Sequence, residues 1–256
     1  MKTLVPLKQT VDLVEELELN DDGTDVEREY LTFKLNEWDE QALEEALLIK
    51  DAVGGEVTVV ALDEPDADQS LYGARAKGAD RAVKLTGDFA AGVSSHARAA
   101  ILAGFLESQS FDLVLIGVQT PEDLDGQTGV ILAGMLGLPH ASVAVAVEPD
   151  GDALKVTQEM GAGVTHQLRI VGPAVVGVQA ARAAPRYVPI SRIRAAMQEG
   201  GLEQQPAAEV EAVSGLTVRR MYAPQSSSHA EMLGADADAA AARIIEIIRE
   251  RGVLKV

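Results

Sequence analysis

The stretch DLVLIGVQTPEDLDGQTG, Asp112–Gly129, decides the fold of this chain. Its apolar segment Leu113–Ile116 is short and bounded by polar residues and glycine, which is typical of a buried parallel strand. A polar loop follows, and after Gly129 apolar residues recur at helical spacing until Gly137. The sequence therefore predicts a strand, a loop and a helix in succession.

This loop is also a candidate phosphate site. Glycines beside a helix N-terminus allow close approach to the backbone, and the unpaired N–H groups there favour an anion. Two interpretations stay open, a nucleotide-binding loop or a turn that merely needs small residues, since the chain has neither GxGxxG nor GxxxxGK[ST]. Glu122, Asp123 and Asp125 would repel a phosphate unless they point outward or bind hydroxyls.

Strand and helix patterns alternate through the first half of the chain. Strands are predicted at Thr3–Leu7, Glu56–Leu62, Ala82–Leu85 and Leu113–Ile116, and helices after Asn36, at Ala67–Lys77 and at about Ser94–Glu107. This alternation predicts an α/β fold with a doubly wound, mainly parallel sheet that binds ligands at the carboxyl ends of its strands. Pro6 indicates an edge position, a bulge or a strand end. Val14–Leu35 is predicted to be a hairpin-like excursion.

After Pro139 the period changes to that of antiparallel strands. Alternating runs are separated by turn residues, which predicts an appended hairpin region at Ala141–Val147, Ala153–Met160 and Thr165–Val171. We expect residues 1–198 to form the α/β domain and residues 199–256 a linker and C-terminal arm. In the arm, Leu216–Tyr222 is predicted to be a strand and Ala235–Arg251 an amphipathic helix. That helix packs either on a partner chain or on its own domain.

Composition limits the class of protein. The chain has 256 residues, 47% of them hydrophobic, and a net charge of −18, which argues against nucleic-acid binding and against an anionic membrane surface. The absence of cysteine excludes disulfides, thiolate catalysis and cysteine-ligated metals. No apolar run has the length of a membrane span and the N-terminus does not resemble a secretory signal, so we expect a soluble cytoplasmic protein without membrane insertion.

No catalytic or metal-binding constellation is visible in the sequence. The four histidines are far apart, and no serine has a G-x-S-x-G setting. The acidic residues of the helix after Asn36 are interpreted as solvated surface charge; they are Glu37, Asp39, Glu40, Glu44 and Glu45. A nucleotide-type fold without catalytic groups suggests a carrier rather than an enzyme.

Four motifs together resemble the β subunits of electron transfer flavoproteins. The loop of that family has the form G-x-Q-x-x-x-D-x-x-x-Q-T-G, which this chain matches at Gly117, Gln119, Asp123, Gln127, Thr128 and Gly129. The opening MKTLVPLK, the helix LNEWDEQALEEALLIK and the segment Pro185-Arg186-Tyr187 are also similar to family motifs, in the same order. The resemblance implies an adenine nucleotide alpha hydrolase-like fold.

The resemblance also implies cofactors. In this family a larger α subunit holds most of the FAD, and the β subunit binds AMP or, in a bifurcating branch, a second FAD; the Gln-Thr-Gly sequence at 127–129 favours AMP. The implied nucleotide contacts are Pro6, Asn36, Leu62, Gly117, Val118, Gln119, Asp123, Gly126, Gln127, Thr128 and Gly129. Asn36 could also cap the helix that follows it. Pro6 and the run Leu124-Asp125-Gly126 depart from the family pattern, so the site could bind AMP weakly or be empty.

A docking segment at about 182–198 is implied as well. Ile190 matches the position of an exposed leucine that docks on acyl-CoA or other flavin dehydrogenases, and Arg186 and Tyr187 would shape the segment. Alternatively, Ile190 packs internally. Electrons would pass on to an acceptor of the electron transfer flavoprotein–quinone oxidoreductase type. Two other classes stay open, a stand-alone adenine-nucleotide-binding regulatory domain of the universal-stress type, and a transferase, for which no catalytic base is visible.

Overall fold

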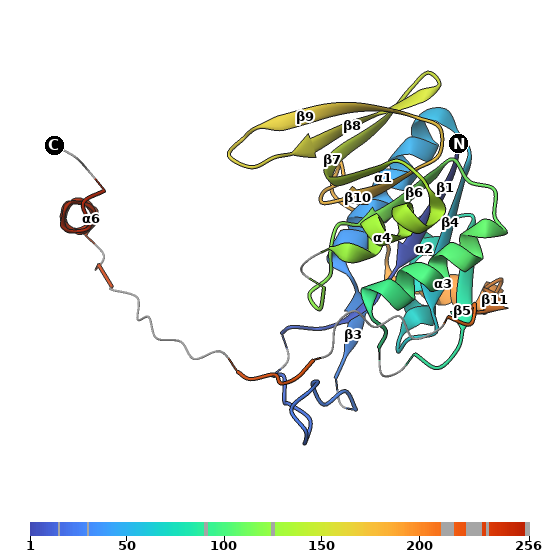
Figure 1. Cartoon of the computed structure of the whole chain (residues 1–256), viewed down its shortest axis with the longest axis horizontal. Coiled ribbons are helices and arrows are strands. Elements are labelled where there is room, and N and C mark those ends of the chain that lie inside the picture. Colours follow the sequence, from blue (N-terminus) through green and yellow to red (C-terminus); the bar gives the residue numbers. More distant parts are fainter. Residues whose placement is uncertain are drawn as a thin grey trace.

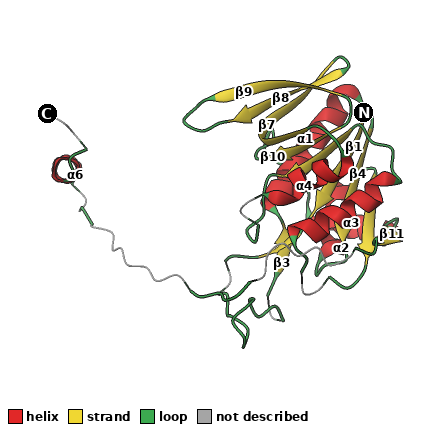
Figure 2. Cartoon of the chain, in the orientation of Figure 1, coloured by secondary structure: helices red, strands yellow, loops and turns green. Residues whose placement is uncertain are grey.

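One large sheet with helices on both faces forms the body of the protein (Figures 1 and 2). The computed structural model describes residues 1–14, 16–29, 31–89, 92–123, 126–210, 218–223, 232–233 and 236–253. The helices are α1 (Glu37–Val53), α2 (Ala67–Lys77), α3 (Ser95–Glu107), α4 (Gln127–Leu136), α5 (Ile190–Glu199) and α6 (Ala237–Glu250). The strands of the sheet are β1 (Lys2–Leu7), β4 (Glu56–Leu62), β5 (Arg81–Thr86), β6 (Leu113–Gly117), β7 (His140–Asp150), β8 (Ala153–Glu159), β9 (Thr165–Val171), β10 (Ala174–Val178) and β11 (Glu203–Pro206). The predicted α/β fold with a mainly parallel sheet is confirmed.

The strand order is β11-β5-β4-β1-β6-β10-β7-β8-β9. From β1 the chain first builds outward through β4 and β5, and then returns to place β6 on the other side of β1. The direction of winding therefore reverses between β1 and β6. In open α/β sheets, the crevice at the carboxyl ends of two such strands is the usual ligand site.

Pro6 lies in β1, a central strand, so the predicted edge position is wrong. The alternative of a strand end is correct, because Pro6 is the penultimate residue of β1. β1 pairs with β6 only at Thr3 and Leu4, whereas its pairing with β4 continues to Leu7. Proline has no N–H to donate. It is tolerated here because the β6 ladder has already ended, and the two strands separate beyond it.

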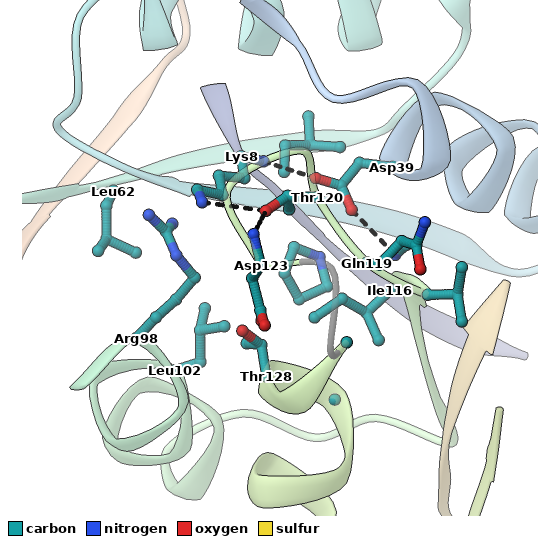
Figure 3. Close-up of a pocket in the computed structure, with 16 residues that line it drawn as sticks. Lys8, Asp39, Leu62, Arg98, Leu102, Ile116, Gln119, Thr120, Asp123 and Thr128 are labelled. Carbon is teal, nitrogen blue, oxygen red and sulfur yellow. Dashed lines mark hydrogen bonds between the residues drawn. The ribbon is translucent and has the colours of Figure 1, made fainter. Parts of the chain in front are cut away.

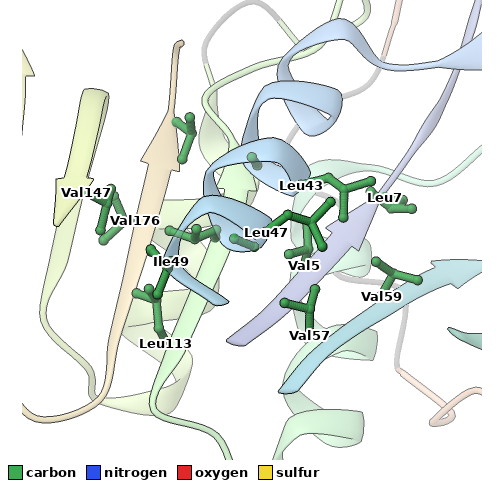
Figure 4. Close-up of a cluster of buried hydrophobic side chains, with 14 of the residues drawn as sticks. Val5, Leu7, Leu43, Leu47, Ile49, Val57, Val59, Leu113, Val147 and Val176 are labelled. Atoms are coloured by element: carbon green, nitrogen blue, oxygen red, sulfur yellow. The ribbon is translucent and has the colours of Figure 1, made fainter. Parts of the chain in front are cut away.

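Alternating side chains of the strands build two cores, one on each face of the sheet. On one face α1 and α2 cover Val5, Leu7 and Val59, and on the other α3 and α4 cover Leu4 and Val60. Figure 4 shows Leu43, Leu47 and Ile49 of α1 packed over the strands of the first face. The aliphatic side chains of both faces explain how a chain with 4% aromatic residues fills its interior.

The predicted hairpin region is present beyond β10. β7 pairs antiparallel with β8, and β8 with β9, while β7 runs parallel to β10 and so joins this region to the main sheet. The excursion at 14–35 also returns on itself, since β2 (Gln9–Val11) pairs antiparallel with β3 (Phe33–Leu35).

The α/β body continues past residue 198. β11 extends the sheet on its β5 edge, where Arg81 donates to both carboxylate oxygens of Glu203 at 3.0 and 2.8 Å. The predicted strand at Leu216–Tyr222 is wrong for residues 218–222, which are not in a strand; residues 216 and 217 lie outside the described residues. That prediction rested only on the alternation of apolar and polar residues in the sequence. The N–H of Met221 donates to Gly23 O at 2.7 Å, but residues 218–222 do not form a ladder of hydrogen bonds with another strand.

The helix α6 confirms the amphipathic pattern at the C-terminus. It makes no extensive contact with another described element and stands apart from the body in Figure 1. Ile244 and Ile245 are exposed. Among the helices that the structure describes, none combines the length and apolar character needed to cross a membrane.

Candidate functional site

A pocket opens at the point where the winding reverses, between the carboxyl ends of β1 and β6. Figure 3 shows its labelled residues converging from the residue after β1, from α1, β4, α3 and β6, and from the loop before α4 and the first turn of α4. Its lining residues are Pro6, Leu7, Lys8, Asp39, Leu62, Arg98, Leu102, Ile116, Gly117, Val118, Gln119, Thr120, Asp123, Gly126, Thr128 and Gly129. The lining combines apolar side chains, among them Leu62 and Ile116, with backbone and polar groups of residues 117–120 and 123.

Most of the expected nucleotide contacts meet around this pocket. The residues brought together are Pro6, Leu62, Gly117, Val118, Gln119, Asp123, Gly126, Thr128 and Gly129. Asn36 and Gln127 do not line it. The departure from the family pattern at Leu124 and Asp125 lies outside the described residues.

Asp39 of α1 links the two chain segments that leave the sheet at the pocket. Its Oδ2 accepts from the N–H of Lys8 at 2.8 Å and its Oδ1 from the N–H of Gly117 at 2.9 Å, so the carboxylate joins β1 and β6 where they no longer pair. The side chain is buried. Burial raises the pKa of the Asp39 carboxyl to about 6, although the hydrogen bonds from Lys8 and Gly117 act in the opposite direction.

Asn36 has a different role from the predicted helix cap. It occupies the cap position of α1, but its side chain makes no capping bond. Instead its Nδ2 donates to the carbonyl of Gln119 at 3.0 Å and so ties the pocket loop to the start of α1. Its Oδ1 is buried and has no hydrogen-bond partner among the described residues. Asn36 thus supports the loop from behind the pocket.

The two loop acids that the structure describes, Glu122 and Asp123, have partners within the protein. Asp123 Oδ2 accepts from the Ser95 hydroxyl at 2.6 Å and from the N–H of Gln127, at the start of α4, at 3.2 Å. The carboxylate of Glu122 pairs with Lys8 Nζ at 2.6 Å. Of the three acids expected to repel a phosphate, these two therefore have partners within the protein, and Asp125 is outside the described residues.

The glycines of the loop allow a close backbone path that a side chain would block. A Cβ at Gly117 would overlap the carboxylate and backbone of Asp39, and a Cβ at Gly126 would overlap the carbonyl of Val118. Gly126 also has a φ of +64°, which L residues rarely adopt. Both positions require glycine for the loop to keep this shape.

A second set of buried acids holds the segment at 182–198. Glu44 accepts from the Arg186 N–H at 2.9 Å and from its guanidinium at 2.9 and 3.0 Å, and Glu45 accepts from Arg182 at 2.7 and 3.0 Å. The interpretation of the α1 acids as solvated charge is therefore wrong for Asp39, Glu44 and Glu45, which are buried. Arginine partners from far along the chain make the burial of Glu44 and Glu45 possible, whereas Asp39 is bound by backbone N–H groups.

The segment held in this way displays apolar side chains to solvent. Ile190 is 66% exposed and Tyr187 86% exposed, which rules out internal packing of Ile190 in this structure. The helix α5 that begins at Ile190 packs on α2. Arg186 shapes the segment through its ion pairs, whereas Tyr187 projects from it.

Several pocket residues could not be recognised from the loop motif, namely Lys8, Asp39, Arg98, Leu102 and Thr120. Arg98 and Leu102 come from α3, one turn apart on the face that covers the sheet. That spacing is the signal that could have indicated them. Within the described parts of the chain, no group of three or more His, Cys, Asp or Glu residues is arranged to hold a metal ion.

Comparison with known proteins agrees with this geometry. The family model for the electron transfer flavoprotein domain matches residues 24–214. The chain is 34% identical to electron transfer flavoprotein subunit beta of Methylophilus methylotrophus over 98% of both chains. The subunit beta of Bradyrhizobium diazoefficiens is 34% identical over 78% of this chain and 79% of its own, and that of Homo sapiens is 31% identical over the same shares.

Proposed function

This chain belongs to the electron transfer flavoprotein family, as a relative of its beta subunits, and on that premise we propose that it binds AMP and helps an α subunit hold FAD. Membership implies an electron-carrier role, a flavin association and a larger partner subunit. We extend this to electron transfer from acyl-CoA or other flavin dehydrogenases to a quinone-linked acceptor. We also place the protein in the cytoplasm.

One observation supports the nucleotide part of the proposal. Nine of the residues expected from the family motif converge on a single pocket at the point where the sheet reverses its winding. Leu7, Leu62 and Ile116 offer an apolar surface for an adenine base, and the first turn of α4 offers N–H groups and the Thr128 hydroxyl for a phosphate. The buried, unpartnered Oδ1 of Asn36 marks an acceptor close behind the loop. These residues fit an adenine nucleotide.

The residues of this chain bind and orient, and the flavin, when bound, takes up and releases the electrons. Asp39, Asn36 and Asp123 fix the loop, and the glycines at 117 and 126 bring its backbone close to the ligand. The Gln-Thr-Gly sequence at 127–129 supports AMP over the adenine half of a second FAD.

The docking part of the proposal concerns residues 182–198. Arg182 and Arg186 hold the start of this segment against α1, and Ile190 within it is exposed. A transient electron-transfer contact needs a small specific anchor of this kind. We assign Ile190 as the anchor for a flavin dehydrogenase. For the exposed amphipathic helix α6, we propose packing on the α subunit.

A content assay tests the nucleotide proposal. The complex of this chain with its partner subunit is denatured, and the released nucleotides are separated and quantified. We expect about one AMP and one FAD per complex, and loss of the AMP but not the FAD from Gly126→Val, in which a side chain would overlap Val118 O. FAD without AMP in the unaltered complex would refute the AMP site. An adenine nucleotide without flavin would instead favour a regulatory domain of the universal-stress type.

A further inference from the structure

Arg98 is a buried cation at the nucleotide pocket with no counterpart in the loop motif. It lies in the first half of α3, is 5% exposed and lines the pocket together with Thr128 and Gly129. Figure 3 shows its side chain rising from α3 toward Leu62 and Lys8. A buried guanidinium is costly unless it is paired, so its place at this cavity calls for a physical reason.

The partner of Arg98 is Glu64, in the loop after β4. The two side chains are 6% and 7% exposed and form an ion pair through Oε1 of Glu64. The other oxygen, Oε2, is buried without a hydrogen-bond partner among the described residues. A guanidinium has five N–H donors, and in the described chain Glu64 is the one side chain to which Arg98 donates. The pair therefore leaves donors of Arg98 unused.

The other charged groups around the pocket are already engaged. Lys8 is held by Glu122 and by the Thr120 hydroxyl at 3.3 Å, and Asp123 by Ser95 and the N–H of Gln127. Asp39 accepts two backbone N–H groups. Arg98 is thus the lining cation with the larger spare donor capacity, since one of its five donors is engaged against two of the three of Lys8. It shares the pocket with the first turn of α4, where backbone N–H groups favour an anion.

We propose that Arg98 binds the phosphate group of the adenine nucleotide, and that Glu64 is a positioning residue that keeps the guanidinium at the pocket. This inference rests on the proposed function. It adds the reason why the site would bind a nucleotide more tightly than the corresponding nucleoside. A guanidinium in a buried setting makes charge-assisted, often paired, hydrogen bonds to phosphate oxygens. Glu64 competes with the phosphate for the same donors, and this limits the affinity for the anion.

The test is calorimetric titration of the two-subunit complex, freed of AMP, with AMP and with adenosine. The unaltered complex should bind AMP at least about tenfold more tightly than adenosine. The free energy of two charge-assisted hydrogen bonds is larger than that of a tenfold difference in affinity. Arg98→Met should remove most of the preference for AMP, leaving only the share that the first turn of α4 and the Thr128 hydroxyl supply, and should leave adenosine binding unchanged. Arg169→Met, which removes an exposed cation of β9, is the control for net charge and should leave both affinities unchanged.

A second variant reports on Glu64. The amide oxygen of Glu64→Gln can still accept from Arg98, but the competing negative charge is gone. We expect AMP to bind several-fold more tightly and adenosine to bind as before, with no gain in the Arg98→Met background. If Glu64 were merely structural, its replacement would shift the unfolding midpoint and leave the ratio of the two affinities unchanged.

The outcomes separate the two proposals. If neither AMP nor adenosine binds to the unaltered complex, the proposed nucleotide site itself fails. If both bind and Arg98→Met keeps the full preference for AMP, the phosphate assignment of Arg98 is wrong while the site stands. Should Arg98→Met not assemble, Arg98→Lys keeps the buried charge but lacks the paired donors, and it should retain a smaller preference for AMP. An unchanged preference in that variant would also refute the assignment.

Discussion

The N–H of Gly117 donates to Oδ1 of Asp39 at 2.9 Å, and this bond joins the end of β6 to the first turn of α1. The other oxygen of Asp39 binds the end of β1. One carboxylate thus joins the two sides of the crevice in which the proposed nucleotide pocket lies. Further along the same helix, Glu44 and Glu45 hold the docking segment, so α1 positions both proposed sites.

Replacing Gly117 should damage the pocket and the fold together. In Gly117→Ala the new Cβ would overlap Asp39, and relieving such overpacking costs roughly 1–3 kcal/mol. We expect a lower urea midpoint and less bound AMP. Gly134→Ala is the matched control, because Gly134 lies in α4 with open space around it. That change should raise stability by about 0.5–1 kcal/mol and leave AMP content unchanged. Equal effects of both variants would contradict the proposed packing at Gly117.

The buried carboxyl of Asp39 should make stability depend on pH. Its pKa in the folded protein is about 6, above its ordinary value of 3.8, so the stability it contributes is full below pH 3.8 and is lost as the pH rises through 6. Asp39→Asn removes this titration. The stability of the unaltered protein relative to Asp39→Asn should fall by about 1 kcal/mol from about pH 5 to about pH 7.5. Urea unfolding of both proteins across that range measures the difference. Parallel stability curves would contradict the raised pKa.

The ion pair of Arg186 with Glu44 should hold the docking segment in place. In Arg186→Met the buried carboxylate of Glu44 loses its guanidinium, at a cost of roughly 1–3 kcal/mol. We expect faster proteolysis within residues 182–189 and a lower urea midpoint. The double variant Arg186→Met with Glu44→Gln should recover part of the stability, because no buried charge is left unpaired. Additive losses in the double variant would show that the two residues do not act as a pair.

Ile190 should matter for electron transfer and not for cofactor content. If it anchors a dehydrogenase, Ile190→Ala should lower kcat/KM for reduction by that dehydrogenase on the order of tenfold, as for a central interface residue. Flavin and AMP content should stay as they are. Val164→Ala, at another exposed aliphatic side chain in the β8–β9 turn, serves as the control. Unchanged transfer by the Ile190 variant would remove the docking assignment.

The local signals of strands and helices were sufficient for most of the fold. β4, α2 and β9 have the predicted limits, because short apolar runs and glycine stops mark them in the sequence. β11 was missed since its four residues, EQQP, carry no apolar pattern. Its place depends on pairing with β5 and on the Arg81–Glu203 ion pair, which is a contact across more than a hundred residues.

The pocket loop was predictable from spacing, but the groups that fix it were not. The acids of α1 have the sequence pattern of a solvated helix face, and their burial depends on partners elsewhere in the chain. Arg182 and Arg186 lie more than 130 residues away from Glu45 and Glu44. The spacing of Arg98 and Leu102 places both on one face of α3, but the ion pair of Arg98 could not be predicted, because Glu64 comes from the loop after β4.

The most direct measurement is to isolate this chain gently from its native cell and record the visible absorbance, the subunit composition and the released nucleotides together. We predict a yellow one-to-one complex with a larger subunit, containing FAD and AMP. A colourless homodimer that carries adenine nucleotide and no flavin would contradict the proposed role in electron transfer, and the docking segment would then need another explanation.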